Sequence, residues 1–96
     1  MAEDHTVRAT ITGRVQGVGF RAFVECEARA RNLKGWVRNR RDGSVEAAFS
    51  GEAAIVDDML AACRRGPSYA RVDGVDVQPA TEAALHASGF AVLPTV

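Results

Sequence analysis

The chain has 96 residues, of which 47% are hydrophobic and 25% charged, and its 12 basic and 12 acidic residues cancel to a net charge of zero. This length supports one hydrophobic core, so we expect a single domain over residues 1–96 with a frayed start at 1–6. The zero net charge argues against a nucleic-acid partner, and the absence of a leader or a membrane-length apolar run predicts no membrane contact. We therefore expect a soluble, cytoplasmic protein; we expect a monomer, although nothing in the sequence decides the oligomeric state.

The first half of the chain alternates between strand and helix patterns. Residues 7–13 alternate apolar and polar side chains, which predicts a strand with one buried face. A glycine-containing loop precedes a predicted helix over 21–33, and Gly35 closes that helix. Residues 36–40 predict a second strand that reaches a hairpin turn at Asp42-Gly43. The inward face of the helix is predicted to carry Phe23, Cys26, Ala30 and Leu33.

The second half of the chain repeats this order. Residues 44–50 predict a third strand, and Ser50 is a candidate cap for a second helix. Arg64, Arg65, Gly66 and Pro67 signal the end of that helix. A fourth strand is expected at 71–78. Residues 80–88 are expected to form a polar, alanine-rich loop whose conformation the sequence does not define, and a short fifth strand at 90–93 remains an option. The inward residues of the second helix are predicted to be Val56, Met59, Leu60 and Cys63.

This order of elements indicates an α+β fold of the ferredoxin-like βαββαβ type. Right-handed crossovers place both helices on one face of an antiparallel sheet. Beneath the helices we expect the alternating residues of the first and third strands, namely Val7, Ala9, Ile11, Val45, Ala47 and Phe49.

Cys26 and Cys63 have neither the spacing nor the neighbouring histidines of a metal or redox site. Both fall on predicted inward helix faces, so buried free thiols are expected and a disulfide is the alternative. His5 and His86 are isolated and are interpreted as surface residues. We expect neither a metal site nor a cofactor.

The stretch from Gly13 to Arg21, with the sequence GRVQGVGFR, joins the first strand to the first helix. Its glycines permit a loop whose backbone amides converge near a helix N-terminus, where negative charge is favoured. Arg21 can add a planar fork for two phosphate oxygens. A phosphate-bearing ligand is therefore expected. We also expect a local excess of positive charge from Arg14, Arg21, Arg38, Arg40 and Arg41, with Asp42 as the acid among them.

Two motifs carry a family resemblance. The stretch 13–21 resembles the first acylphosphatase signature at every defined position, and residues 35–45 (GWVRNRRDGSV), followed by Gly51, resemble the second. The resemblance implies an enzyme that hydrolyses the carboxyl-phosphate anhydride of acyl phosphates without a metal, with inorganic phosphate as product and inhibitor. It implies that Arg21 binds phosphate and that Asn39 positions water. The phosphate-binding set would be Val15, Gln16, Gly17, Val18, Gly19, Phe20 and Arg21.

Three alternatives were considered against this interpretation. The stretch 17–22 fits a loose dinucleotide-binding pattern, but the chain is too short for a doubly wound sheet. RNA binding would need exposed strand aromatics, whereas Trp36 and the phenylalanines occupy mostly core-compatible positions. A non-catalytic module that binds phosphate or another small anion on the same fold stays open as the alternative.

Overall fold

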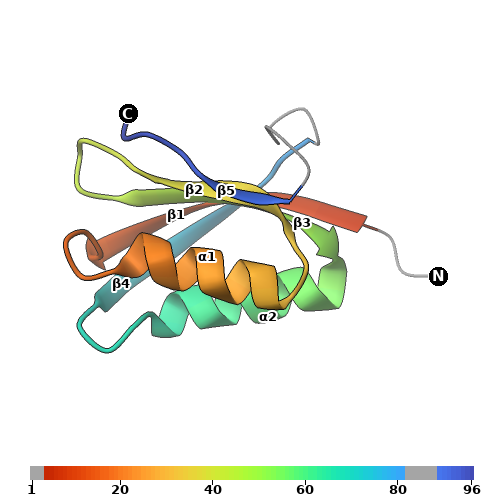
Figure 1. The fold of residues 1–96 in the computed structure, drawn as a ribbon, viewed down its shortest axis with the longest axis horizontal. Coiled ribbons are helices and arrows are strands. Elements are labelled where there is room, and N and C mark those ends of the chain that lie inside the picture. Colours follow the sequence, from red (N-terminus) through yellow and green to blue (C-terminus); the bar gives the residue numbers. More distant parts are fainter. Residues whose placement is uncertain (1–3, 82–88) are drawn as a thin grey trace.

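The computed structural model describes residues 4–81 and 89–96; residues 1–3 and most of the predicted loop at 80–88, with His86, lie outside the described part. The elements are β1 (Asp4–Arg14), α1 (Phe20–Ala30), β2 (Lys34–Asn39), β3 (Val45–Glu52), α2 (Ala53–Arg65), β4 (Arg71–Pro79) and β5 (Phe90–Val92). The strands form one sheet in the order β4-β1-β3-β2-β5. Figure 1 shows both helices on the same face of this sheet, as the ferredoxin-like prediction requires. In the described residues, no helix is long and apolar enough to cross a membrane.

The fifth strand makes the sheet mixed. The pairs β1–β3, β1–β4 and β2–β3 are antiparallel. β5 instead runs parallel to β2, with Val37 opposite Val92. The direction follows from the path of the chain. β4 ends at the end of the sheet where β2 begins, because Pro79 lies opposite Val7 and Lys34 lies beside the same part of β3. β5 therefore starts from the same end of the sheet as β2, at the edge opposite β4, and runs in the direction of β2.

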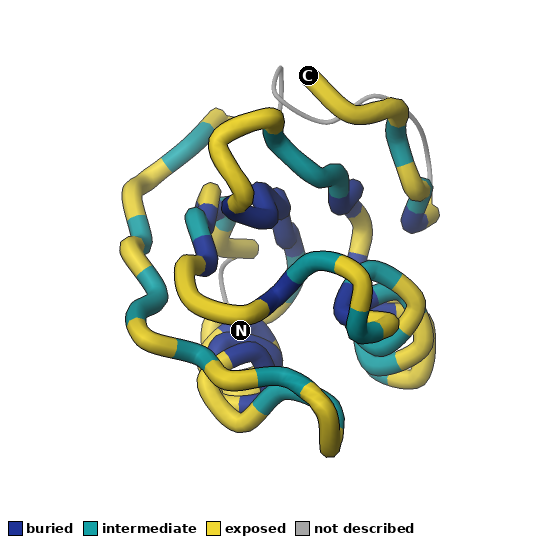
Figure 2. The backbone as a smooth tube through the Cα atoms, turned by 90° about the vertical axis from the view of Figure 1, so that its left-hand side faces the viewer, coloured by how far each residue is buried: buried dark blue, intermediate teal, exposed yellow. Residues whose placement is uncertain are grey.

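The core lies between the sheet and the two helices. The β1–β3 register sets Val7 opposite Phe49, Ala9 opposite Ala47 and Ile11 opposite Val45, so the apolar residues of both strands form rows on the helix side. All six are at most 3% exposed, and the inward residues predicted for α2 are buried too. The dark segments of Figure 2 are these central strands and the inner sides of the helices. The predicted core is confirmed for both strands and for α2.

The predicted inward face of α1 is wrong for Cys26 and Ala30, which are exposed, whereas Leu33, which follows the helix, is buried as predicted. The buried residues are Phe20, Val24 and Ala28, while Phe23 is half-buried and Cys26 is exposed. The helix begins one residue earlier than predicted, at Phe20, which the sequence assigned to the loop. Once Phe20 is helical, its large ring occupies the core, and the residues at steps of four follow it inward.

The end of α1 also differs from the prediction. Asn32 adopts a left-handed conformation with φ of 56°, and the amide of Leu33 donates to Ala28 O at 3.0 Å. This pattern is a Schellman motif, which ends the helix several residues before Gly35. Gly35, with φ of 143°, is needed instead inside β2, because a Cβ there would collide with the Ala48 carbonyl of the neighbouring strand.

Two other boundaries differ from the prediction. Residues 4–6, expected to be frayed, belong to β1, where Asp4 lies opposite Glu52. Ser50 does not cap α2, because β3 continues to Glu52, the N-cap residue. The Ser50 hydroxyl instead shares a hydrogen bond of 2.8 Å with the Thr6 hydroxyl across β1 and β3. The longer β1–β3 pairing accounts for both differences.

Candidate active site

The loop between β1 and α1 is held at both ends by buried side chains. Val15 and Phe20 are each 1% exposed and belong to the core cluster. Between them, Gly17 and Gly19 have φ of 73° and 79°, in the left-handed region that glycine adopts without strain. The loop therefore has a defined path that its two anchors and two glycines determine.

The N-terminus of α1 faces this loop without an acidic side chain. Gly19 is the N-cap residue and forms no side-chain cap hydrogen bond, and the first helical turn contains no acidic residue. The amide of Phe23 donates to Gly19 O at 3.0 Å, so the amides that precede it have no acceptor within the helix. These donors, together with the helix dipole, favour a bound anion.

A cavity of about 390 Å³ opens beside the loop, large enough for a small ligand. Arg21 and Asn39, which lie on α1 and β2, both line it. Of the predicted phosphate-binding residues, Val18 does not line the cavity; its half-buried side chain packs against the core. The lining residues are Val15, Gln16, Gly17, Gly19, Phe20, Arg21, Ala22, Glu25, Asn39 and Val92.

Asn39 is the last residue of β2 and shares the helix-side face with Val37. Its side-chain Oδ1 is buried and has no hydrogen-bond partner among the described residues. Most buried polar atoms in proteins do have a partner, so an acceptor without one at a cavity wall is suited to a ligand or a water. The backbone around Asn39 is fixed, because its carbonyl accepts from Val96 N at 3.1 Å and Arg41 N donates to Val96 O at 2.8 Å.

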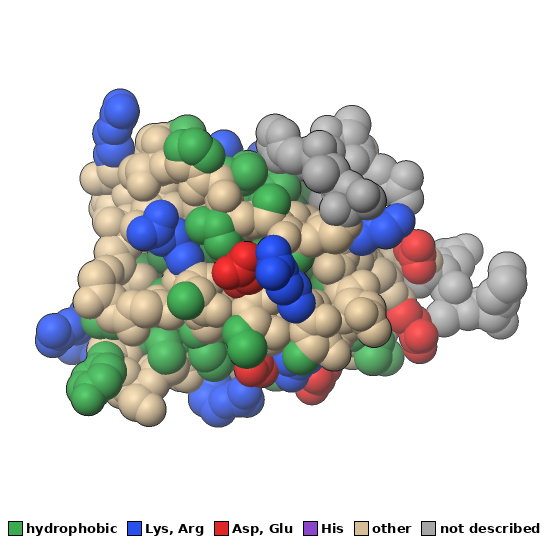
Figure 3. All heavy atoms as spheres, in the orientation of Figure 1, with side chains coloured by type: hydrophobic (Ala, Val, Ile, Leu, Met, Phe, Trp, Pro, Cys, Tyr) green, Lys and Arg blue, Asp and Glu red, His purple; other side chains and the backbone are tan. Residues whose placement is uncertain are grey.

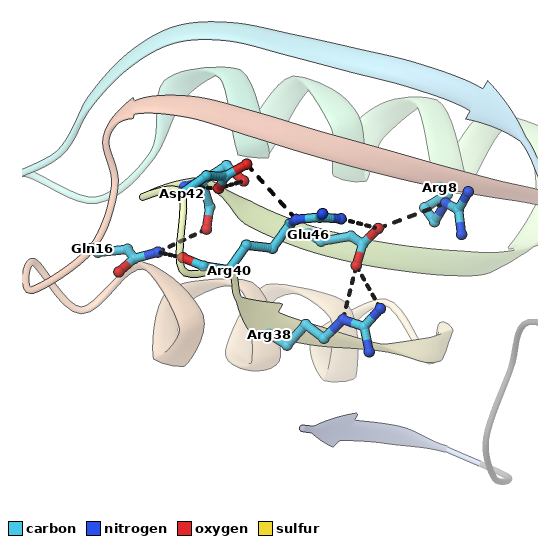
Figure 4. Close-up of polar contacts among 7 residues, drawn as sticks. Arg8, Gln16, Arg38, Arg40, Asp42 and Glu46 are labelled. Atoms are coloured by element: carbon cyan, nitrogen blue, oxygen red, sulfur yellow. Dashed lines mark hydrogen bonds and ion pairs between the residues drawn. The ribbon is translucent and has the colours of Figure 1, made fainter. Parts of the chain in front are cut away.

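Gln16 joins the glycine loop to the β2–β3 hairpin. Its Nε2 donates to the carbonyls of Arg40 at 2.7 Å and Ser44 at 2.8 Å, as Figure 4 shows. The side-chain amide thus uses both hydrogens on the hairpin, and it is the backbone of Gln16 that remains for an anion. The sequence prediction assigned Gln16 to phosphate and missed this connection, since the hydrogen bonds span 24 and 28 positions.

The hairpin turn is closed by Asp42, as the Asp-Gly pair predicts. Asp42 Oδ1 accepts from the Ser44 amide at 2.9 Å and from the Ser44 hydroxyl at 2.6 Å. The hydroxyl bond, followed by the amide bond, lowers the pKa of Asp42 below its usual value. The carboxylate stabilises the turn that follows Asn39.

The sequence predicts that five arginines add positive charge near the glycine loop, and this is wrong for Arg38 and Arg40 of the β2–β3 hairpin. Arg38 and Arg40 point to the sheet face opposite the helices, where they contact the carboxylate of Glu46 at 2.8 and 3.3 Å (Figure 4). Arg8 lies 3.8 Å from the same carboxylate. Glu46 is buried, with 4% of its surface exposed. Side chains alternate along a strand, so Arg38 and Asn39 cannot face the same side. Arg14 and Arg41 do not line the cavity, which leaves Arg21 as the lining arginine.

Charge on the face that carries α1 is accordingly mixed. Figure 3 shows acidic, basic and hydrophobic side chains next to one another over α1, without a continuous basic patch. Glu25, which the sequence analysis did not select, lies one turn after Arg21 and lines the cavity. The i, i+4 spacing from Arg21 was the signal that could have identified it. Val92 gave no such signal, since only the sheet topology brings β5 to the site.

Cys26, Cys63 and His5 do not line the cavity. Both cysteines are free; Cys63 is buried as predicted, whereas Cys26 is exposed, contrary to the prediction. Burial raises the pKa of the Cys63 thiol to about 12. His5 lies in β1 and is exposed. Within residues 4–81 and 89–96, no cluster of three or more His, Cys, Asp or Glu side chains could hold a metal ion.

Comparison with known proteins adds independent evidence. Residues 7–92 match the acylphosphatase family. An acylphosphatase of Rhodopseudomonas palustris (strain BisB18) is 55% identical over 93 residues, which cover 93% of this chain and 94% of that protein. The crystal structure of acylphosphatase from Bacillus subtilis superposes with a TM-score of 0.85 at 36% identity, covering 92% of this chain and 97% of that one.

The same fold also occurs within a larger protein. Full-length HypF, solved in a phosphate- and nucleotide-bound form, matches with a TM-score of 0.87 at 27% identity; the match covers 99% of this chain but 12% of that one. The extent of the family match and the identity to a curated relative decide the assignment. The chain belongs to the acylphosphatase family, whose members are enzymes.

Proposed function

We propose that the cavity beside the β1–α1 loop binds the phosphoryl group of an acyl phosphate and hydrolyses its carboxyl-phosphate anhydride bond. One observation carries the proposal: Arg21, the glycine loop and Asn39, whose buried Oδ1 has no hydrogen-bond partner among the described residues, line the same cavity. In this proposal the products are a carboxylate and inorganic phosphate, and inorganic phosphate competes with substrate.

The loop amides and Arg21 are assigned to the phosphoryl oxygens. The amides at the start of α1 have no intrahelical acceptors, and the guanidinium can form two parallel hydrogen bonds to phosphate oxygens. As the anhydride bond breaks, negative charge is redistributed over the phosphoryl oxygens, where these fixed donors stabilise it. Binding and charge stabilisation thus come from the same groups.

Asn39 is assigned to the attacking water. Its Oδ1 can accept a hydrogen bond from water, but an amide has no titrating proton and cannot act as a base. The water oxygen bonds to phosphorus, the bond from phosphorus to the carboxyl oxygen breaks, and the leaving carboxylate keeps the electron pair. The proton of the water passes to a phosphoryl oxygen of the substrate, so the reaction is substrate-assisted.

The mechanism uses no metal ion. An acyl phosphate is already activated, so positioning and charge stabilisation supply what catalysis needs. In the described part of the chain, the side chains that line the cavity include Gln16, Arg21, Glu25 and Asn39, which do not form a metal-binding group. We therefore propose metal-independent hydrolysis.

A phosphate-binding module without catalysis is the second candidate. The match to HypF favours it in one respect, because there the same fold is a small part of a much longer chain. The two candidates share the anion site and differ in whether Asn39 directs a water.

Purified protein mixed with benzoyl phosphate separates the two candidates. The enzyme proposal predicts steady release of benzoate and phosphate, inhibited competitively by added inorganic phosphate. Binding of inorganic phosphate without any release of benzoate would instead support the non-catalytic module.

A further inference from the structure

The cavity is larger than the proposed phosphoryl site requires. The loop amides and Arg21 account for the phosphoryl oxygens, and Asn39 accounts for the water. The lining residues left without a role are Ala22 and Glu25 of α1 and Val92 of β5. The acyl group of the substrate has to lie against the remaining wall, which these three residues form.

The two elements of this wall are joined by Arg29. Its Nη2 lies 3.0 Å from Glu25 Oε2 and donates to the Phe90 carbonyl of β5 at 3.1 Å. This bridge fixes the Glu25 carboxylate on the side of α1 that faces β5. The Glu25 side chain is 32% exposed and that of Arg29 is 63% exposed. Because water screens an ion pair at the surface, Arg29 compensates the Glu25 charge only in part.

The chemistry of the wall is half acidic and half apolar. Glu25 follows Arg21 by four residues, which places their Cβ atoms about 6 Å apart on the helix surface. Val92 is 41% exposed and contributes apolar surface to the same cavity. A second negative charge on the acyl group would therefore meet a carboxylate close to the phosphoryl site.

We propose that Glu25 and Val92 select the acyl group, favouring acyl phosphates with a neutral, apolar or aromatic acyl group over those with a second negative charge. The inference rests on the proposed function. Two like charges that share one small, partly hydrated cavity repel enough to change a rate constant several-fold, and the neighbouring Arg29 reduces the effect. We expect the Glu25 charge to account for a preference of about 3- to 10-fold.

The test compares kcat/KM for benzoyl phosphate, which has a neutral acyl group, with that for succinyl phosphate, which carries a second carboxylate. The unmodified protein should prefer benzoyl phosphate. In Glu25→Gln, which keeps the shape and removes the charge, the ratio of succinyl to benzoyl kcat/KM should rise by about 3- to 10-fold.

Glu27→Gln is the matched control. Glu27 lies on the same helix and forms the same type of i, i+4 ion pair, with Arg31 at 3.0 Å, at a similar exposure of 29%. It does not line the cavity. The control removes one negative charge and one helical ion pair, so it should leave the substrate ratio unchanged.

A measurement on the unmodified protein does not depend on the folding of any variant. Raising the ionic strength from about 0.03 M to about 0.3 M shortens the range of charge repulsion. Because both substrates share the phosphoryl group, the ratio of succinyl to benzoyl kcat/KM should rise with salt. A ratio that is constant or falls contradicts the proposal.

The outcomes separate this inference from the function on which it rests. If the unmodified protein hydrolyses neither substrate, the proposed function fails and the inference fails with it. If Glu25→Gln hydrolyses benzoyl phosphate normally with an unchanged ratio, only the acyl selection is wrong. If it loses turnover on both substrates equally, Glu25 acts on the reaction itself and the selection role is also wrong.

Discussion

Arg21 lies in the first turn of α1, where a side chain and the helix amides can act on one anion. We expect Arg21→Lys to lower kcat/KM for benzoyl phosphate about 100-fold, because a point charge cannot replace the two parallel hydrogen bonds of the guanidinium. Inhibition by inorganic phosphate should weaken as well. Steady-state kinetics with phosphate as inhibitor measures both effects, and a fully active lysine variant would remove Arg21 from the role proposed here.

The candidate residues could be found from the sequence, whereas their roles stay proposals. Arg21 and Asn39 belong to the two motifs that resemble the acylphosphatase signatures, and the structure brings both to one cavity. Gln16 was selected for its position in the loop, but its side chain serves the hairpin. Such a contact joins distant parts of the chain, and local spacing contains no information about it.

The β2–β3 hairpin carries Asn39 between two arginines that are held on the opposite face of the sheet. Arg38 and Arg40 both contact the buried Glu46, so we expect this network to fix the backbone on either side of Asn39. Glu46→Gln should lower the free energy of unfolding by about 1–3 kcal/mol, since it removes the charge that these hydrogen bonds need. It should lower kcat by about 10-fold through looser positioning of Asn39.

Urea unfolding and kinetics on the same preparation test the role of the hairpin network. Glu27→Gln is the control: it removes a half-buried ion pair on α1, but Arg31 keeps its second partner, Asp58, at 2.8 Å, so the free energy of unfolding should change by less than about 1 kcal/mol. An unchanged urea midpoint in Glu46→Gln would show that the network does not stabilise the hairpin.

The corrected orientation of α1 has its own test in the two thiols. Cys26 is exposed, whereas burial holds the pKa of Cys63 at about 12 and keeps its thiol protonated. We expect an aromatic disulfide reagent at pH 8 to modify one thiol of the folded protein quickly and the second only after denaturation. Cys26→Ser should abolish the fast phase. A fast phase that persists in that variant would contradict the observed face of α1.

At the level of elements, the sequence predicted the first four strands and both helices and left the fifth strand as an option, but it did not predict which face of α1 is buried. The alternation in β1 and β3 identifies which face of each strand is buried. This assignment stays correct when the predicted strand ends are wrong by one or two residues. In α1 the residue that sets the inward face is Phe20, which the sequence motif places in the loop. A helix wheel counted from Arg21 onward omits this ring, so the neighbouring stripe with Phe23 and Cys26 looks equally plausible.

The whole molecule presents a cavity without a histidine or a cysteine among its described lining residues. Arginine and glutamate side chains ordinarily titrate outside the range between about pH 7 and 9, so kcat should vary little across it. Because the proposed mechanism has no metal ion, EDTA should leave the rate unchanged. A bell-shaped profile centred in this range, or inhibition by EDTA that added metal reverses, would contradict a substrate-assisted, metal-independent reaction.

At this scale the sequence predicted the layers and the end of the sheet where the cavity lies, but not that Val92 would line the cavity. The fold follows from the order of the elements. The cavity lies at the end of the sheet where β1 passes into the glycine loop, and the position of that loop in the sequence predicts this end. Val92 reaches the cavity because β5 pairs in parallel with β2, a long-range pairing with no local signal. The single-domain, monomeric and cytoplasmic assignments stay predictions, and the match to HypF makes the domain boundary the first of them to test.

The central claim is that Asn39 directs a water at a phosphoryl group that other residues hold. The most direct measurement is kcat for benzoyl phosphate together with the inhibition constant of inorganic phosphate, in the unmodified protein and in Asn39→Ala. The account predicts that kcat falls by about 100- to 1,000-fold while the inhibition constant changes by less than about 2-fold, because the loop and Arg21 remain. An alanine variant that keeps the kcat of the unmodified protein would contradict the account.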